Sequence, residues 1–330
     1  MKKTVLVTGT SGFIGGRLAQ RLMETGVQVR CSYRREKLTP VLESLRDSGA
    51  ELQRGNLSDE TYLEQLLDGI SAVYHVAGKS SDWGSLESFR DANALAVDKL
   101  FKAAKKAGAT RAVHLSSLSV HGFGPHKDST EEGPYYRHIN PYQISKKEGE
   151  DIALAANEPG FHLSVIRPGN VYGPQDTTTS FPIFEAMEAG KMGFLSKGAA
   201  LTCPVYVDDL IDAILAAGEV PEAAGEVFNI TGDELITWKE LITLNAGALD
   251  LPVPKLNVPG ALAMAVAHIM SGTAKLLRLK NSPPLTPYRV AQLTDDYHFS
   301  MEKARRILGY NPKVTYSEGV VKTAASYRSR

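Results

Sequence analysis

The sequence predicts an α/β protein, with a Rossmann-type, doubly wound parallel sheet followed by a smaller, mixed C-terminal lobe. Short β-rich runs alternate with helical stretches through the first half of the chain, which is typical of right-handed β-α-β units. Runs such as Val5-Leu6-Val7 are apolar throughout, as expected of strands that helices cover on both faces. After about Gly169, glycine and proline become frequent and β-rich runs become isolated. We therefore expect a sheet domain over residues 1–168 and a second lobe over residues 169–330, partly interwoven with it.

The expected elements follow from the positions of apolar runs, caps and breakers. Strands are expected at residues 4–8, 28–33, 51–54, 72–76, 111–116 and 162–167, with isolated strands at 205–207 and 227–230. Helices are expected at residues 12–24, 39–47, 59–67, 86–107 and 142–157. A last helix is expected to start at a Ser300 cap and to end at Gly309.

The bulk composition excludes several classes of protein. The 330 residues carry 37 basic and 37 acidic side chains, and a net charge near zero gives no reason to expect nucleic acid as a partner. The two cysteines, Cys31 and Cys203, lie far apart, and neither they nor the histidines show metal-ligand spacing. The N-terminal apolar run is too short for a signal peptide. We therefore expect a cytoplasmic protein with no metal site.

An uncharged, alanine-rich stretch runs from Leu256 to Ala274. A transmembrane helix needs about 20 predominantly apolar residues, whereas polar residues, glycine and proline interrupt this stretch. We expect no transmembrane span, and instead a buried or pocket-lining helix. A helix that lies in a membrane interface is the alternative, so contact of residues 256–279 with a membrane stays open.

A glycine-rich turn joins the first expected strand to the first expected helix. Gly9 allows the tight turn, Gly12 lets the backbone approach a diphosphate, and Gly15 lets the helix pack on the strand. Free N–H groups at the helix N-terminus favour an anion there. We expect a nicotinamide dinucleotide on this turn; a turn that only tightens packing is the alternative. The same motif contains Ser11, Phe13 and Ile14.

The position of this turn in the first half of the chain assigns cofactor binding to that half. The residues after the second expected strand indicate which cofactor binds. Residues 1–168 would be a dinucleotide-binding domain and residues 169–330 a substrate lobe. An acidic residue after the second strand would bind the adenosine ribose hydroxyls of NAD. The chain has Arg34 and Arg35 there, and a forked guanidinium can pair with the 2′-phosphate of NADP. We expect NADP, with NAD as the alternative cofactor and a simple exposed basic loop as the alternative structure.

Tyr142 and Lys146 lie four residues apart on a helix that Asn140 can cap and Pro141 can begin. A tyrosine hydroxyl has an ordinary pKa of about 10, so acid–base chemistry near neutrality requires the pKa to fall by about three, or about 4 kcal/mol. An ammonium one turn away favours the phenolate. The alternative is an ordinary amphipathic helix on which this spacing arises by chance.

Hydroxyl groups follow the expected strand at residues 111–116. Ser116, Ser117 and Ser119 lie at its carboxyl end, which is where parallel sheets place active sites. A hydroxyl there could hold a substrate oxygen against the phenol of Tyr142. Serines that only cap the strand exit are the alternative.

Together these residues resemble the extended short-chain dehydrogenase/reductase family, and the similarity runs through most of the chain. The resemblance implies that Ser117, Tyr142 and Lys146 are catalytic and that Asn93 helps to position the lysine through water. It implies that Asn56, in place of the usual Asp of the family, lies beside the adenine with Leu57. The other implied cofactor contacts are Val76, Ala77, Gly78, Pro168 and Val171.

Differences between branches of this family bear on the reaction. Sugar-nucleotide dehydratases carry an Asp-Glu pair after the catalytic serine or threonine, where this chain has Leu118-Ser119, so dehydration is not expected. Sugar epimerases usually carry Arg-Tyr-Phe-Asn where this chain has Arg-Pro-Gly-Asn at residues 167–170. This form and residues 283–288 are similar to the 3β-hydroxysteroid dehydrogenase and dihydroflavonol reductase branches.

We therefore expect an NAD(P)-dependent oxidoreductase that interconverts a ketone or aldehyde and an alcohol on a small, fairly apolar substrate, with Tyr142 as general acid or base. A nucleotide-sugar epimerase is the main alternative. An NADP-binding sensor without chemistry and a redox protein that uses its cysteines are further alternatives. The resemblance also implies a homodimer formed through the helices at 86–107 and 142–157.

Overall fold

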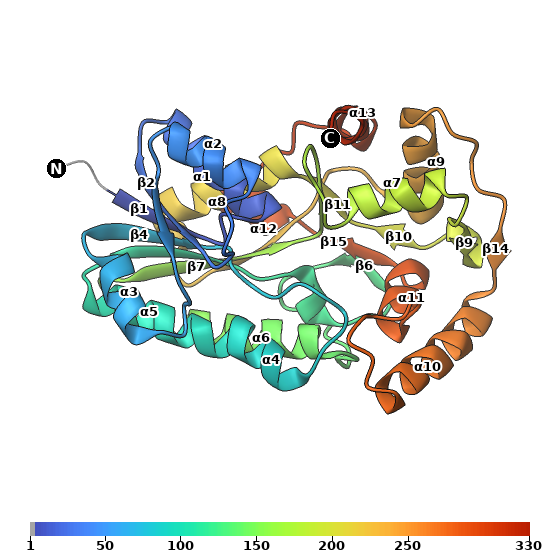
Figure 1. The fold of residues 1–330 in the computed structure, drawn as a ribbon, viewed down its shortest axis with the longest axis horizontal. Coiled ribbons are helices and arrows are strands. Elements are labelled where there is room, and N and C mark those ends of the chain that lie inside the picture. Colours follow the sequence, from blue (N-terminus) through green and yellow to red (C-terminus); the bar gives the residue numbers. More distant parts are fainter. Residues whose placement is uncertain (1–3) are drawn as a thin grey trace.

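A seven-stranded sheet forms the centre of the molecule (Figure 1). The computed structural model describes residues 4–330, so residues 1–3 of the segment considered for a signal peptide lie outside the described residues. Every pairing of adjacent strands in this sheet is parallel, which confirms the predicted doubly wound, Rossmann-type sheet. The strands are, in spatial order, β12 (Val227–Ile230), β7 (His162–Pro168), β5 (Arg111–Leu115), β4 (Ile70–His75), β1 (Thr4–Thr8), β2 (Gln28–Tyr33) and β3 (Glu51–Arg54).

Helices cover both faces of the sheet (Figure 1). Along β1, Val5 and Val7 belong to one apolar core and Leu6 to the other, because successive side chains of a strand point to opposite faces. Helices on the first face are α1 (Phe13–Glu24), α2 (Pro40–Asp47), α8 (Val207–Glu219) and α12 (Glu302–Leu308). Helices on the second face are α3 (Glu60–Leu67), α4 (Leu86–Arg90), α5 (Ala96–Lys106) and α6 (Pro141–Ala155).

The second half of the chain both completes the sheet domain and builds a lobe. Its strand β12 pairs with β7, and its helices α8 and α12 cover the sheet. A separate apolar core lies among α7 (Ser180–Glu188), α9 (Trp238–Ala248) and α13 (Tyr316–Arg328). Paired short strands are β6 (His126–Ser129) with β15 (Tyr297–Phe299), β8 (Asn170–Tyr172) with β11 (Pro204–Tyr206), β9 (Phe194–Leu195) with β14 (Asn257–Val258), and β10 (Leu201–Thr202) with β13 (Ile236–Thr237).

Helices α10 (Gly260–Leu276) and α11 (Pro287–Thr294) pack together at the edge of the lobe (Figure 1). Among residues 4–330, no helix combines the length and the apolar character that a membrane crossing requires. The expectation that the stretch from Leu256 forms a buried or pocket-lining helix is only half correct. One face of α10 is buried on α11, but large apolar side chains on the other face are exposed.

Two details of the expected helices are wrong. A π-helical turn, η1 (Asp91–Leu95), separates α4 from α5 and so interrupts the helix expected over residues 86–107. At the other end of the chain, α12 has no side-chain cap, because Ser300 precedes it by two residues and accepts a hydrogen bond only from the N–H of Glu302, at 3.3 Å. Gly309 ends that helix in the left-handed conformation, as expected.

Candidate active site

The turn after β1 is shaped for the close approach of backbone and ligand. Gly9 has a φ of +73°, and a Cβ there would lie 2.9 Å from the backbone of Ala77. A Cβ on Gly15 would lie 2.4 Å from the carbonyl oxygen of Gly9, so α1 can pack on the turn only with glycine at this position. Gly12 begins α1 without a side-chain cap, which leaves the first N–H groups of the helix for an anion. The turn therefore fits the diphosphate of a dinucleotide.

The ends of β2 and β3 lie beside this turn. The carbonyl oxygen of Ser32 accepts hydrogen bonds from the N–H groups of Gly9 and Thr10, at 3.0 and 3.3 Å. Arg34 and Arg35 follow β2 directly and are exposed, so their guanidinium groups are accessible to a ligand. Asn56, after β3, is exposed, and its Oδ1 accepts a hydrogen bond from the N–H of Ser58 at 3.1 Å.

The other residues predicted to contact the cofactor vary in exposure. Ser11, Phe13 and Ile14 are half-buried at the start of α1, and Leu57 is half-buried after β3. Pro168 is buried at the end of β7, where it pairs with Ile230 of β12. Val171 is half-buried in β8 and packs against the core that lies under α1. Phe13, Ile14 and Val171 therefore all pack against the same core.

The segment after β4 lies against the glycine-rich turn. Thr8 Oγ1 accepts hydrogen bonds from the N–H groups of Val76 and Ala77, at 3.1 and 3.0 Å, and pairs with His75 Nδ1 at 2.8 Å. Burial lowers the pKa of His75 to about 3, so its imidazole is neutral. The sequence did not suggest this role for Thr8, which fixes β1 to the segment that follows β4.

Gly78 lies where this segment meets two predicted site residues. A Cβ on Gly78 would lie 3.1 Å from Asn93 Oδ1 and 3.9 Å from Lys146 Nζ. Asn93 is buried in η1, and its amide accepts from the N–H of Lys79 at 2.7 Å and donates to Ser145 Oγ at 3.0 Å. Asn93 therefore ties the segment after β4 to α6, while the water-mediated link to Lys146 stays a prediction.

Helix α6 carries Tyr142 and Lys146 and begins as the sequence predicts. Asn140 Oδ1 accepts a hydrogen bond from the N–H of Gln143 at 3.0 Å, and Pro141 occupies the first turn. Lys146 is buried, and its Nζ donates to the carbonyl oxygen of Leu115, at the end of β5, at 2.6 Å. Burial lowers the pKa of Lys146 to about 8, and the Glu150 carboxylate opposes that shift.

The phenol of Tyr142 is surrounded by hydroxyl groups. Burial raises the pKa of Tyr142, and the neighbouring hydroxyl groups of Ser117, Ser80 and Ser119 act in the opposite direction. The pKa of Tyr142 is therefore raised rather than lowered in this structure, in which the Lys146 ammonium donates to the carbonyl oxygen of Leu115. That Lys146 favours the phenolate when cofactor is bound stays a prediction. Ser80, in the segment after β4, was missed by sequence reasoning because no motif marks it.

The three serines after β5 have different surroundings. Ser117 caps the 3₁₀ turn η2 (Leu118–His121), and its Oγ accepts a hydrogen bond from the N–H of Ser119 at 3.2 Å. Ser116 is buried and donates to Glu150 Oε2 at 2.6 Å. Ser116 therefore belongs to the support of the site, whereas Ser117 and Ser119 lie next to Tyr142.

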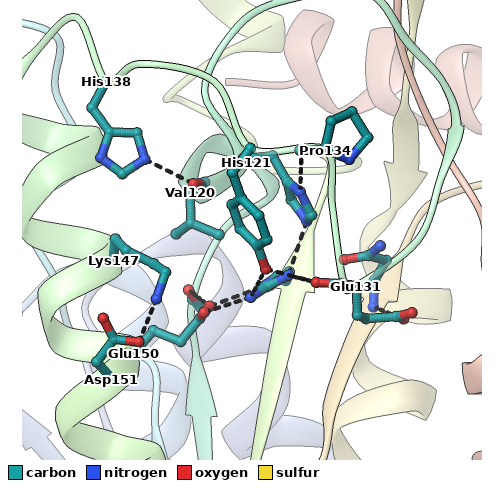
Figure 2. Close-up of polar contacts among 12 residues, drawn as sticks. Val120, His121, Glu131, Pro134, His138, Lys147, Glu150 and Asp151 are labelled. Carbon is teal, nitrogen blue, oxygen red and sulfur yellow. Dashed lines mark hydrogen bonds and ion pairs between the residues drawn. The ribbon is translucent and has the colours of Figure 1, made fainter.

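A buried ion pair between Arg167 and Glu150 lies beside the site. Arg167 donates to Glu150 at 2.9 and 2.6 Å, to the carbonyl oxygen of Glu131 at 3.0 Å and to Tyr135 at 2.9 Å, and it contacts His121 Nε2 at 2.9 Å. Figure 2 shows Glu150, His121 and Glu131 around one guanidinium group, which the hydrogen bonds above identify as that of Arg167. Burial alone would raise the pKa of Glu150, but Arg167 holds it below its ordinary value. Loss of one partner of such a pair costs about 3–5 kcal/mol.

Aromatic side chains face Tyr142 from two sides. The ring centroid of Tyr288, on α11, lies 6.4 Å from that of Tyr142 and 4.9 Å from that of Phe123. Phe89, on α4, also lies 6.4 Å from Tyr142. Sequence reasoning missed this aromatic wall, although residues 283–288, which contain Tyr288, contributed to the family resemblance.

Ionic contacts hold α11 against the sheet domain. Asp82, in the segment after β4, pairs with Arg289 at 2.9 Å and accepts a hydrogen bond from Thr286 Oγ1 at 2.6 Å. Trp83 Nε1 donates to the carbonyl oxygen of Leu279 at 3.2 Å. The Trp83 side chain therefore contacts the backbone of the lobe, and Tyr288 is the aromatic residue of α11 that lies near the phenol.

The side chains that could bind a metal ion or act as thiol nucleophiles lie apart from one another in the described residues. Among residues 4–330, no group of three or more His, Cys, Asp or Glu side chains could hold a metal ion. Cys31 and Cys203 are free and buried, and burial raises the pKa of each thiol to about 12. Neither thiol is a ready nucleophile, because reactivity requires the thiolate.

Several known proteins are similar to this chain in sequence or in fold. The model of the NAD dependent epimerase/dehydratase family matches residues 5–231. A 2-alkyl-3-oxoalkanoate reductase of Stenotrophomonas maltophilia is 30% identical over 98% of this chain and 98% of its own length. A decarboxylating sterol-4-alpha-carboxylate 3-dehydrogenase of Mus musculus is 29% identical over 98% of this chain and 91% of its own. The UDP-glucuronic acid 4-epimerase of Bacillus cereus, solved with NAD, shares the fold with a TM-score of 0.80 at 22% identity over 99% of each chain.

Proposed function

This chain belongs to the NAD dependent epimerase/dehydratase family, and we propose that it is an NADP(H)-dependent oxidoreductase acting on a small, apolar carbonyl compound or the corresponding alcohol. The observation that carries the proposal is the phenol of Tyr142, which Ser117, Ser80 and Ser119 surround and which the Tyr288 ring faces. The hydroxyls supply a place for one reacting oxygen. The aromatic rings supply contacts for an apolar body.

Residues around the glycine-rich turn would hold the cofactor. Gly9, Gly12 and Gly15 let the diphosphate approach the N-terminus of α1, and Gly78 leaves room beside Lys146. When bound, the nicotinamide supplies or accepts the hydride. Asn93 would position Lys146, whose ammonium would hold the ribose hydroxyls.

Tyr142 would transfer the proton. In the reducing direction, Ser117 and Tyr142 hydrogen-bond the substrate carbonyl oxygen, and Tyr142 donates its proton to that oxygen as general acid. Its raised pKa keeps the phenol protonated at neutral pH, which suits this direction. The positive charge of Lys146 then favours the phenolate that remains. In the oxidising direction, Tyr142 accepts the proton.

The choice of cofactor rests on Arg34 and Arg35. We expect NADPH to give a higher kcat/KM than NADH, and the double variant Arg34→Gln/Arg35→Gln to lower kcat/KM for NADPH by about tenfold or more while NADH is little changed. Arg46→Gln, on the exposed face of α2, is the matched control. A wild-type preference for NADH would contradict NADP as the cofactor.

The substrate class is tested by a panel assay that follows NADPH oxidation. The panel contains apolar ketones and aldehydes, a 2-alkyl-3-oxo acid and a 3-keto sterol, because relatives of this chain bear the names of enzymes for such compounds. We expect turnover with at least one apolar carbonyl compound. The fold similarity to a UDP-glucuronic acid 4-epimerase favours a second candidate, nucleotide-sugar epimerisation. Conversion of UDP-sugars without net cofactor consumption, and no carbonyl reduction, would decide for that candidate.

The proposal extends to the whole protein. We place the dinucleotide in residues 1–168 and the substrate in residues 169–330, in a cytoplasmic homodimer formed through α4, α5 and α6. The aromatic wall from α11 supports the placement of the substrate, since Tyr288 reaches the phenol from the second half of the chain.

A further inference from the structure

Helix α10 turns its small residues inward and its large apolar residues outward. The inward residues are Ala263, Ala267, Ser271 and Ala274. The outward residues are Leu262, Val266, Ile269 and Leu276, with exposed fractions of 56%, 39%, 69% and 83%. Steps of four, three and seven residues put the outward set on one stripe of the helix. A helix that served only to complete the core would carry its large residues inward.

The chain around this stripe is strongly basic. Residues 251–294 contain five Lys or Arg side chains and no Asp or Glu, in a chain whose formal net charge is zero. Arg289 pairs with Asp82, whereas the other four form no ion pair with any residue of 4–330. These four are Lys255, Lys275, Arg278 and Lys280. The last three alternate with leucines, of which Leu277 and Leu279 are exposed by 63% and 51%.

We propose that residues 262–280 form a docking surface for an anionic phospholipid bilayer. An apolar helical stripe with cations at its end can bury its side chains among acyl chains while the cations contact lipid phosphates. A second copy of this chain fits the surface less well, because it would bring two sets of unpaired cations together without an acidic partner in this segment. Docking leaves the chain on the membrane surface, since no helix among residues 4–330 can cross it.

The docking surface is joined directly to the candidate active site. Leu279 accepts the hydrogen bond from Trp83, and the adjoining segment leads to Tyr288, whose ring faces Tyr142. Docking would therefore bring the aromatic wall close to lipid-dissolved compounds. This consequence rests on the proposed function, whereas docking itself does not.

Sedimentation with vesicles tests the docking surface. Vesicles of equimolar phosphatidylglycerol and phosphatidylcholine should bind the wild-type protein, and vesicles of pure phosphatidylcholine should bind it much more weakly. The double variant Ile269→Ser/Leu276→Ser should weaken binding by about tenfold or more. Each of Lys275→Gln, Arg278→Gln and Lys280→Gln should weaken it by about fivefold. Leu235→Ser, which changes a leucine exposed by 65% elsewhere in the lobe, should bind as wild type does.

Each outcome of this experiment decides for or against docking. Failure of wild type to bind either vesicle would overturn the proposal, as would equal binding by all the variants. A concentration-dependent dimer that the double variant abolishes, with no vesicle binding, would assign the surface to a second copy instead. Reduction of a water-soluble ketone should be the same in every variant. Vesicle binding without reduction of any ketone would contradict the proposed function but would still support docking.

Discussion

Lys146 is a buried residue of the candidate site, and its burial predicts how the free energy of unfolding depends on pH. Its pKa falls to about 8 in the folded chain, whereas the unfolded chain keeps this proton up to about pH 10.4. Between these values the unfolded state binds more protons, so the free energy of unfolding should rise with pH by about 1 kcal/mol per pH unit from this residue. Below pH 8 the contribution should not change with pH.

Urea denaturation of wild type and Lys146→Met across pH 7–10 measures this contribution as a difference. We expect the difference to grow in favour of wild type as the pH rises through 8. A difference that stays constant over this range would show that the ammonium is not desolvated as the structure places it.

At the same scale, the sequence could propose site residues where the argument depends on local spacing. Tyr142 and Lys146 were proposed because residues four apart share a helix face. Ser80 and Tyr288 were not found, because tertiary packing brings them to the phenol from distant segments. The direction of the pKa shift of Tyr142 was wrong for a related reason, since burial is a property of the packed molecule.

At the scale of the elements, the close contact between η1 and α6 predicts that a larger side chain at position 149 lowers both stability and turnover. A Cβ on Gly149 would lie 1.8 Å from the carbonyl oxygen of Asn93, so the two helical segments approach closely only with glycine here. Gly149→Ala should lower the free energy of unfolding by about 1–3 kcal/mol and reduce kcat, because it displaces Asn93 from α6. Denaturation and turnover measure the two effects.

Gly247→Ala, in α9, is the matched control for that substitution, because nothing lies within 4 Å of a Cβ placed there. It should leave the free energy of unfolding unchanged or raise it by up to about 0.5 kcal/mol, because alanine favours the helix but Gly247 lies in its last turn. Equal effects of the two substitutions would contradict the close contact between η1 and α6.

The elements themselves were largely predictable. The expected strands match the seven strands of the sheet within one or two residues, and continuous burial on both faces explains the clear pattern of the central ones. The expectation that residues 227–230 form an isolated strand was wrong, because β12 pairs with β7 in the sheet. The π turn at η1 was not predictable from this pattern, since one widened turn does not disturb the apolar periodicity. This turn contains Asn93, whose carbonyl oxygen lies close to Gly149, and only the packed structure reveals that contact.

At the scale of the whole molecule, the ion pair between Asp82 and Arg289 joins the two parts of the chain beside Tyr142. Asp82→Asn should raise KM for the apolar substrate by roughly threefold to tenfold, because α11 and Tyr288 lose a charged tether. KM for NADPH should be unchanged. Asp250→Asn, which removes the exposed pair with Arg328, is the control and should change neither constant. Equal changes in both KM values would contradict a role confined to the substrate side.

The sequence predicted the parallel sheet. The division into a domain over residues 1–168 and a lobe over residues 169–330 stays a prediction, and β12, from the second half of the chain, pairs with β7 of the first half. The sequence did not predict the contact of Asp82 with Arg289, because those residues lie far apart along the chain and no motif pairs them. The exposed face of α10 was likewise ambiguous, since an alanine-rich stretch does not show which of its faces is buried.

The central claim is that the phenol of Tyr142 gives the proton at a dinucleotide site. The most direct test is to measure turnover and NADPH binding together in Tyr142→Phe, with the best carbonyl substrate of the panel. We predict that kcat falls by about a hundredfold to ten-thousandfold while the Kd for NADPH changes by less than about twofold. Unchanged turnover, or loss of NADPH binding as large as the loss of turnover, would contradict the claim.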